Sequence, residues 1–223
     1  MAPAGAGRGR AAPAAADITG VIGASSTGKG LYAKQRLRAP QRRPGLALVW
    51  SPMEETDRYA AFLDAPGVTT TTGLIEAVRA GAPRVVYVAD LDRPRARLVD
   101  EFTLFCQLAY RRAARVLVEE LSYVTLASWA PPAWSKLSTA GSHHRVIELI
   151  GTAQRPTMID KNFLGGCSEV RCYRLAWEDD AVRMRKLLRG PTAEQLMDLP
   201  NRHFFHRYIH QARTVEGVQA VPR

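Results

Sequence analysis

The sequence predicts an α/β domain with a mostly parallel central sheet and helices on both faces. The first observation behind this class is an alternation along the chain, in which short apolar runs of strand length are separated by longer segments of helical periodicity. Such an order brings parallel strands side by side and packs the crossover helices on the sheet. The second observation is a glycine-rich loop, Gly23 to Gly30, between the first apolar run and the first helical segment.

The expected strands are short apolar runs bounded by turn residues or charges, and they lie at 17–22, 46–50, 84–89, 115–118, 145–151 and 170–176. The expected helices lie at 31–38, within 52–64, and at 74–80, 94–113 and 133–140. The helix at 94–113 is the longest, because Leu98, Phe102 and Phe105 repeat at spacings of three and four. One threonine among residues 69–72 is the expected N-cap of the helix at 74–80.

We divide the chain into a basic tail (1–16), an α/β core (17–176) and a small helical C-terminal extension (177–223). The tail is rich in Ala, Pro, Gly and Arg, which is typical of a flexible segment. The extension has expected helices at 179–188, 192–199 and 202–213. In the last of these, His206 and His210 stand four residues apart, a spacing that can hold a metal on a helix. Packing of the neighbouring aromatic residues against the core is the favoured interpretation.

The composition favours a polyanionic partner. The chain has 31 Lys and Arg residues against 21 Asp and Glu residues, a net charge of +10, and 46% hydrophobic residues for a core. Nucleic acid is the first candidate partner and a membrane surface the second, whereas a basic surface that is only solvated is the alternative. A basic cluster at 34–43 has the same two interpretations, DNA phosphate contact or a solvated face. The three cysteines show no metal-binding or disulfide spacing and suit a reducing compartment, and no apolar run is long enough to span a membrane.

The glycine-rich loop has the spacing of a Walker A phosphate-binding loop, G-x-x-x-x-G-K. In such a loop, backbone N–H groups at a helix N-terminus point at the phosphates and a lysine reaches the β and γ oxygens. The residues expected to bind nucleotide are Gly23, Ala24, Ser25, Ser26, Thr27, Gly28, Lys29, Gly30 and Leu31. The loop departs from the pattern at Gly30, where a Ser or Thr hydroxyl normally binds Mg²⁺. Thr27, Ser26, Ser25 or a water molecule remain as replacements.

Two acids, Glu119 and Glu120, follow the buried strand at 115–118. Ligands bind at the carboxyl edge of an open parallel sheet, and hydrolysis of a nucleoside triphosphate needs one carboxylate near Mg²⁺ and one that orients or deprotonates the attacking water. We assign Glu119 to the metal and Glu120 to the water. Asp90 and Asp92, which follow the strand at 84–89, are the competing acids. We favour Glu119 and Glu120 because of their distance from the loop along the chain, since the long helix at 94–113 directly precedes them.

A third polar signal is Gln154, which ends the strand within 147–156 and precedes Arg155 and Pro156. A polar side chain between the loop and the acids can sense the γ-phosphate through hydrogen bonds. The alternative is a polar turn after a strand.

Together the loop, the acidic strand and the segment GTAQRPTMIDKNFLGGCSEVRCYRL resemble the ATPase core of the FtsK–HerA superfamily of DNA-pumping motors. The resemblance covers about residues 17–175 and implies a RecA-like P-loop NTPase core that binds ATP and Mg²⁺. It implies that Lys29 is the phosphate lysine, that Glu119 is the Mg²⁺ ligand and Glu120 the catalytic base, and that Gln154 is the polar sensor. It also implies an arginine that reaches the nucleotide of a neighbouring subunit, for which Arg171 is the first candidate and Arg174 and Arg155 are rivals.

A lone core of this size is most similar to the genome-packaging ATPases of membrane-containing, tailless double-stranded DNA viruses. The resemblance implies sequence-independent contacts with double-stranded DNA, a homo-oligomeric ring of six subunits, other vertex proteins of the virion as partners, and action in the host-cell cytoplasm. Three alternatives stay open: an assembly or export ATPase of the filamentous-phage type, a small-molecule phosphotransferase, and a nucleic-acid-binding protein without hydrolysis, in which Gly30 marks a decayed site.

Overall fold

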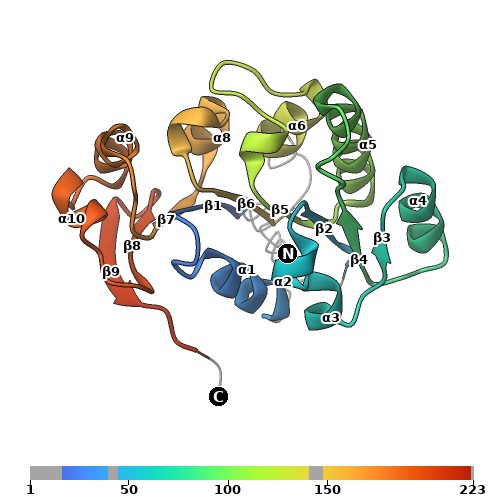
Figure 1. Cartoon of the computed structure of the whole chain (residues 1–223), viewed down its shortest axis with the longest axis horizontal. Helices are drawn as coiled ribbons and strands as arrows, with labels where there is room; N and C mark the ends of the chain where they lie inside the picture. Colours follow the sequence, from blue (N-terminus) through green and yellow to red (C-terminus); the bar gives the residue numbers. More distant parts are fainter. Residues whose placement is uncertain (1–16, 40–44, 141–147, 222–223) are drawn as a thin grey trace, which may run out of the picture.

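The structure, a computed structural model, describes residues 17–39, 45–140 and 148–221. A nine-stranded sheet in the order β3-β4-β2-β5-β6-β1-β7-β8-β9 runs through the molecule (Figure 1). The pairings from β3 to β7 are parallel, and the β7–β8 and β8–β9 pairings are antiparallel. The strands are β1 (Ile18–Ile22), β2 (Ala47–Ser51), β3 (Gly67–Val68), β4 (Arg84–Val88), β5 (Arg115–Val118), β6 (Leu149–Ala153), β7 (Glu169–Cys172), β8 (His203–Tyr208) and β9 (Arg213–Val218).

Helices cover both faces of the sheet, as the sequence predicted. They are α1 (Lys29–Arg38), α2 (Glu54–Asp57), α3 (Tyr59–Leu63), α4 (Thr71–Arg79), α5 (Arg95–Arg112), α6 (Pro132–Ser135), α8 (Lys161–Gly166), α9 (Glu178–Leu188) and α10 (Ala193–Met197), with short turns η1 (Leu121–Tyr123), η2 (Lys136–Ala140) and η3 (Pro156–Met158). Figure 1 shows α1 and α3 on one face and α5, α6 and α8 on the other. Among the described residues, no helix has the length and apolar character needed to cross a membrane.

Two hydrophobic clusters fill the space between the sheet and these helices. Residues alternate between them along each strand, so that Trp50 packs in the larger cluster on the α5 face while Val49 packs under α1 and α3. In the larger cluster the ring of Trp50 stacks on Tyr87 at 5.0 Å between centroids and meets Phe102 edge-on at 5.0 Å. A strand buried on both faces reads as a continuous apolar run, which is why the parallel strands were predictable.

Most predicted elements are confirmed, with shifted ends. The predicted strand at 145–151 is found as β6, and its residues 145–147 lie outside the described part of the chain. The predicted strand at 170–176 is shorter, because β7 ends at Cys172. The N-cap of α4 is Thr70, whose hydroxyl accepts a hydrogen bond from the N–H of Gly73 at 3.1 Å. Helix α8 and strand β3 were not predicted.

The predicted helix at 202–213 is wrong. These residues form β8 and the start of β9, a hairpin that extends the sheet beyond β7. Phe204 and His206 are buried on the α1 face, and an antiparallel partner covers the otherwise open edge of β7. His206 and His210 therefore share no helix face, and no group of three metal-ligating side chains occurs in the described residues. The extension thus combines the two predicted helices, α9 and α10, with a β-hairpin.

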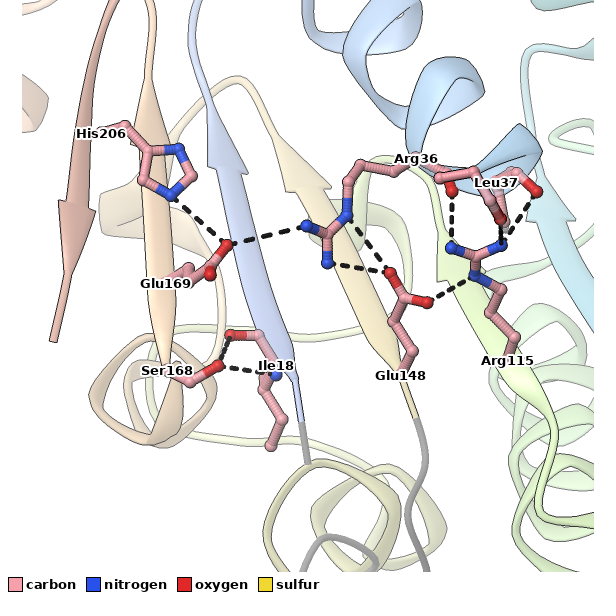
Figure 2. A network of polar contacts seen from close by, with 9 residues as sticks. Ile18, Arg36, Leu37, Arg115, Glu148, Ser168, Glu169 and His206 are labelled. Atoms are coloured by element: carbon pink, nitrogen blue, oxygen red, sulfur yellow. Dashed lines mark hydrogen bonds and ion pairs between the residues drawn. The ribbon is translucent and has the colours of Figure 1, made fainter. Parts of the chain in front are cut away.

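Figure 2 shows a network of ion pairs that anchors the end of α1 to the strands beneath it. Arg36 Nη2 lies 2.9 Å from Glu148 Oε1, and Arg115 Nε lies 2.6 Å from Glu148 Oε2. Arg115 also donates to the backbone oxygens at the end of α1, including Leu37 O at 2.9 Å. On the other side, Glu169 Oε2 lies 3.3 Å from His206 Nε2. The network fixes α1, and with it the glycine-rich loop at its opposite end.

Candidate nucleotide-binding site

The glycine-rich loop connects β1 to the N-terminus of α1, as predicted. Gly28, the N-cap of α1, has a φ of 119°, a conformation that L side chains rarely adopt. At Gly23, an added Cβ would lie 2.7 Å from Tyr173 Cβ. The loop is tied to the sheet by two backbone bonds, from Gly23 N to Ala153 O at 3.2 Å and from Ala24 N to Arg174 O at 2.8 Å. Both glycines of the Walker A pattern therefore have a physical reason, and two backbone hydrogen bonds fasten the loop to the sheet.

Lys29 lies inside this loop. Its Nζ donates to Gly23 O at 2.7 Å and to Ala24 O at 2.9 Å. Burial lowers the pKa of this ammonium group, while the nearby carboxylates of Glu120, Glu119 and Asp57 oppose the shift. The two carbonyl contacts are ones that phosphate oxygens can replace, because an ammonium group binds phosphate as a point charge.

Glu119 is buried at the end of β5 and accepts a hydrogen bond from Tyr59 Oη at 2.7 Å. Its pKa is raised well above the ordinary value, first by burial and then by the carboxyl group of Asp57, while Tyr59 and Lys29 act in the opposite direction. Burial also raises the pKa of Tyr59, so its hydroxyl keeps the proton that it donates. Tyr59 and Asp57 were not predicted as site residues. They follow β2, which pairs with β5, and the sequence does not reveal this neighbour relation.

Glu120 lies directly after β5 in a left-handed conformation, with φ 48° and ψ 68°. Non-glycine residues adopt this region at a cost, and it is found at functional sites. Its N–H donates to Thr152 Oγ1 at 3.0 Å, and its Oε1 accepts from Ser122 Oγ at 2.9 Å and from Gln154 N at 3.1 Å. The strained backbone is thus held by contacts from both sides, and the carboxylate is aimed along the edge of the sheet.

Strand β6 lies between β1 and β5 in the sheet, so Gln154 at its end stands between the loop and the two acids. Its backbone touches Glu120, and its side chain is exposed. The structure therefore brings Lys29, Glu119, Glu120 and Gln154 to one edge of the sheet. Asp90 lies at the end of β4, with β2 between that strand and β5, and its carboxylate pairs with Arg93 at 3.2 Å.

The hydroxyl groups of the loop have different surroundings. Thr27 is buried and its Oγ1 donates to Ala24 O at 2.8 Å, so this hydroxyl holds the loop together. Ser25 and Ser26 are exposed at the tip of the loop. Gly30 is the second residue of α1 and faces the acids.

Arg171, the first candidate for the arginine that acts in a neighbouring subunit, is held inside its own subunit. Its guanidinium carbon lies 3.9 Å from the ring centroid of Tyr32 and 3.7 Å from that of Phe204. Its Nε donates to His206 Nδ1 at 3.1 Å and its Nη1 to Gln219 Oε1 at 2.8 Å. Two of its three guanidinium nitrogens thus have partners in the same chain, and the expected contact with the nucleotide of a neighbouring subunit stays a prediction.

The two rival arginines differ as well. Arg155 pairs with the buried Asp180 at 2.5 Å, and its guanidinium carbon lies 4.6 Å from the ring centroid of Trp177. Arg174 is exposed, and its carbonyl accepts the loop bond from Ala24 N. Of the three arginines, Arg174 is the one that stands on the surface beside the loop.

The basic cluster at 34–43 is only partly described. Arg36 belongs to the ion-pair network, and Arg38 stacks on the ring of Phe62 at 3.8 Å. Residues 40–44, with Arg42 and Arg43, lie outside the described part of the chain. The charge of Arg36 is thus paired with Glu148 inside the chain, and a phosphate contact of the cluster stays a prediction.

Comparisons with known proteins show that other chains share this fold. The genome packaging NTPase B204 from Sulfolobus turreted icosahedral virus 2, in complex with AMP, superposes with a TM-score of 0.69 at 14% identity, and the match covers 92% of this chain and 98% of that chain. VirB4 of Thermoanaerobacter pseudethanolicus gives a TM-score of 0.67 at 9% identity, covering 92% and 89%. The N-terminal domain of zonular occludens toxin from Neisseria meningitidis gives 0.51 at 14% identity, covering 94% and 96%.

No protein-family model matches the chain, and a search of curated proteins finds no match. The expected fold class, an α/β P-loop NTPase core with a mostly parallel sheet, is confirmed by the structural likeness. At these identities the likeness shows the fold, and the chemistry must be argued from the site.

Proposed function

We propose that this chain is an ATPase of the FtsK–HerA superfamily that pumps double-stranded DNA, in the manner of a viral genome-packaging motor. The observation that carries the proposal is the meeting of Lys29, Glu119, Glu120 and Gln154 at one edge of the sheet, beside the glycine-rich loop. B204, which shares the fold, has been solved with AMP, with AMPPCP and with ATP-gammaS.

In the proposed reaction, backbone N–H groups of the loop and the N-terminus of α1 bind the β- and γ-phosphates of ATP. The Lys29 ammonium group exchanges its two carbonyl partners for phosphate oxygens. Glu120 accepts a proton from the attacking water, whose oxygen bonds to the γ-phosphorus as the bond to the bridging oxygen breaks, and ADP and phosphate are released. Gln154 lies beside Glu120 and orients the water or the γ-phosphate by hydrogen bonding.

The carboxylate oxygens at Glu119 suit Mg²⁺, because this ion prefers hard oxygen ligands. A bound Mg²⁺ would neutralise charge on the phosphate oxygens. Glu119 would hold it, with its carboxylate oriented by Tyr59 Oη. Burial and the neighbouring carboxyl group of Asp57 raise the pKa of Glu119, and a divalent cation is the natural partner for such a pair of carboxyl groups.

An arginine from a neighbouring subunit would complete the site by neutralising charge on the transferred phosphoryl group. We replace Arg171 by Arg174 in this role, since Arg174 is the exposed arginine beside the loop. A residue acting in trans requires a closed assembly, for which we propose a hexameric ring with DNA in its centre. Contacts with phosphate rather than bases would make DNA binding independent of sequence and sensitive to salt. The net charge of +10 supports such contacts.

The test is the rate of ATP hydrolysis by the purified chain with and without double-stranded DNA. The Lys29→Ala and Glu120→Gln variants are expected to lower turnover about 100-fold or more, because each removes a group used in the transition state. Lys186→Ala, which removes an exposed lysine of α9, is the matched control and should behave as wild type.

The outcomes separate the alternatives. Equal turnover in wild type, Lys29→Ala and Glu120→Gln would refute the hydrolysis. Hydrolysis that DNA does not stimulate would refute the motor and leave a small-molecule phosphotransferase. DNA binding without any turnover would point to a nucleic-acid-binding protein with a decayed site. Salt-insensitive DNA binding would exclude the phosphate contacts.

A further inference from the structure

The surroundings of Gly30 contain an unusual set of oxygen atoms. A Cβ atom added at Gly30 would lie 3.6 Å from Asp57 Oδ1, 3.7 Å from Tyr59 Oη and 3.9 Å from Glu119 Oε1. These are ordinary van der Waals distances, so the position has room for a side chain and the glycine is not required by crowding. Gly30 is also helical and has no left-handed backbone conformation that would favour glycine. Its lack of a side chain therefore leaves a space that is bordered by two carboxylates and a hydroxyl.

Asp57 is brought to this space by a rigid turn between α2 and α3. Glu54 at the start of α2 accepts a hydrogen bond from Ala60 N at 2.7 Å, and Arg58 adopts a left-handed conformation between the two helices. The N–H of Asp57 donates to Met53 O at 2.8 Å. Because β2 lies beside β5, this turn lies over the end of the strand that carries Glu119.

We propose that Asp57 serves as the second protein ligand of Mg²⁺ in this site, taking the place of the loop hydroxyl that is absent at Gly30. The inference rests on the proposed function, since it concerns Mg²⁺ that accompanies a nucleotide. The position of the missing hydroxyl and the carboxylate of Asp57 border the same space, since Asp57 Oδ1 lies 3.6 Å from a Cβ atom added at Gly30. The hydroxyl of Thr27 is engaged by its hydrogen bond to Ala24 O, and Ser25 and Ser26 are exposed at the tip of the loop.

The test measures binding rather than turnover. The dissociation constant of a fluorescent ATP analogue is measured in Mg²⁺ and in EDTA, and Mn²⁺ bound in the presence of ADP is counted by electron paramagnetic resonance. In Asp57→Asn, the tightening of nucleotide binding by Mg²⁺ is expected to fall about tenfold or more. Binding in EDTA is expected to be unchanged or tighter, because one negative charge near the phosphates is gone. Glu55→Gln removes an exposed charge of the same short helix and is the matched control.

A rescue variant tests whether the two residues share one position. Gly30→Ser combined with Asp57→Asn places a hydroxyl in the same space, and we expect it to regain most of the Mg²⁺ effect. Asp57→Asn is expected to fold at least as stably as wild type in the absence of metal, because it relieves the repulsion between two carboxyl groups, and circular dichroism melting checks this.

The results distinguish this inference from the proposed function. If the wild type binds nucleotide, and Mg²⁺ tightens nucleotide binding by Asp57→Asn as much as by wild type, the proposed role of Asp57 is wrong while the ATP site stands. If the double variant binds no better than Asp57→Asn, the shared position is wrong. If the wild type binds no nucleotide in Mg²⁺ or in EDTA, the proposed function fails and this inference fails with it.

Discussion

Replacing Arg171 by alanine tests whether this residue stabilises its own subunit or serves a neighbour. The guanidinium group lies between the rings of Tyr32 and Phe204 and donates to His206 and Gln219. Arg171→Ala would remove these contacts at once and leave the buried His206 Nδ1 without its donor, whereas Gln219 Oε1 would keep the hydrogen bond from Tyr173 Oη at 3.0 Å. A residue kept for an intersubunit contact would instead have its head group free.

The expected cost follows from these contacts. Two hydrogen bonds from a charged group contribute about 1.5 kcal/mol each at the lower end of measured values. Cation–π contacts with two rings add about 1 kcal/mol in total for a partly exposed group. The free energy of unfolding should therefore fall by about 4 kcal/mol, which for a chain of this size lowers the melting temperature by about 10 °C.

The assay is equilibrium unfolding in urea, followed by circular dichroism. Arg174→Ala is the matched control, because this arginine is exposed and lies three residues further along the chain, and its unfolding should follow wild type. In mixed assemblies, Arg174→Ala subunits should regain hydrolysis when combined with Glu120→Gln subunits, since an arginine in trans complements a missing base. An Arg171→Ala variant that unfolds as wild type would refute the reasoning and return Arg171 to the role that the sequence suggested.

Three further predictions concern the groups around the site. The pKa of Glu169 is lowered, first by its hydrogen bond with His206, so its stabilising effect is complete above its ordinary value of 4.5 and is lost as the pH falls through the lowered value. When the pH is lowered from about 5 to about 3, the free energy of unfolding, measured in urea, should therefore fall less for Glu169→Gln than for wild type. An equal fall in the two proteins would contradict this. Gly151→Ala should cost about 1–3 kcal/mol in the same assay, because its Cβ would lie 2.5 Å from a buried phenylalanine ring, and wild-type stability would show that the ring yields freely. Ser122→Ala should lower kcat about tenfold with unchanged nucleotide affinity, since it releases the carboxylate of Glu120, the proposed catalytic base; an unchanged kcat would exclude this positioning role.

Much of the site was accessible to sequence reasoning because it is local. The Walker A loop needs its glycines and its lysine within eight consecutive positions, and the observed contacts at Gly23 and Gly28 explain them. The pair Glu119–Glu120 follows a continuous apolar run, and a parallel strand buried on both faces produces such a run. The ends of parallel strands meet at one edge, so the neighbourhood of Gln154 and Glu120 also followed from the pattern.

The C-terminal hairpin was missed because its aromatic residues suit either a helix or a strand. The open edge of β7, which lies in another part of the chain, decided the choice. For the same reason the sequence could not tell that Arg171 faces Phe204 and His206 across two strands. Likewise, Asp57 lies near Glu119 and Gly30 only because β2 lies beside β5.

The sequence by itself therefore determined the fold class, the phosphate loop and the acids at the strand ends, since these depend on residues close together in the chain. Only the tertiary structure decided which arginine is exposed beside the loop, what faces Gly30 and how the sheet ends. Those features depend on strand order, which places side chains from distant segments within a few ångströms of one another and leaves no trace in local periodicity.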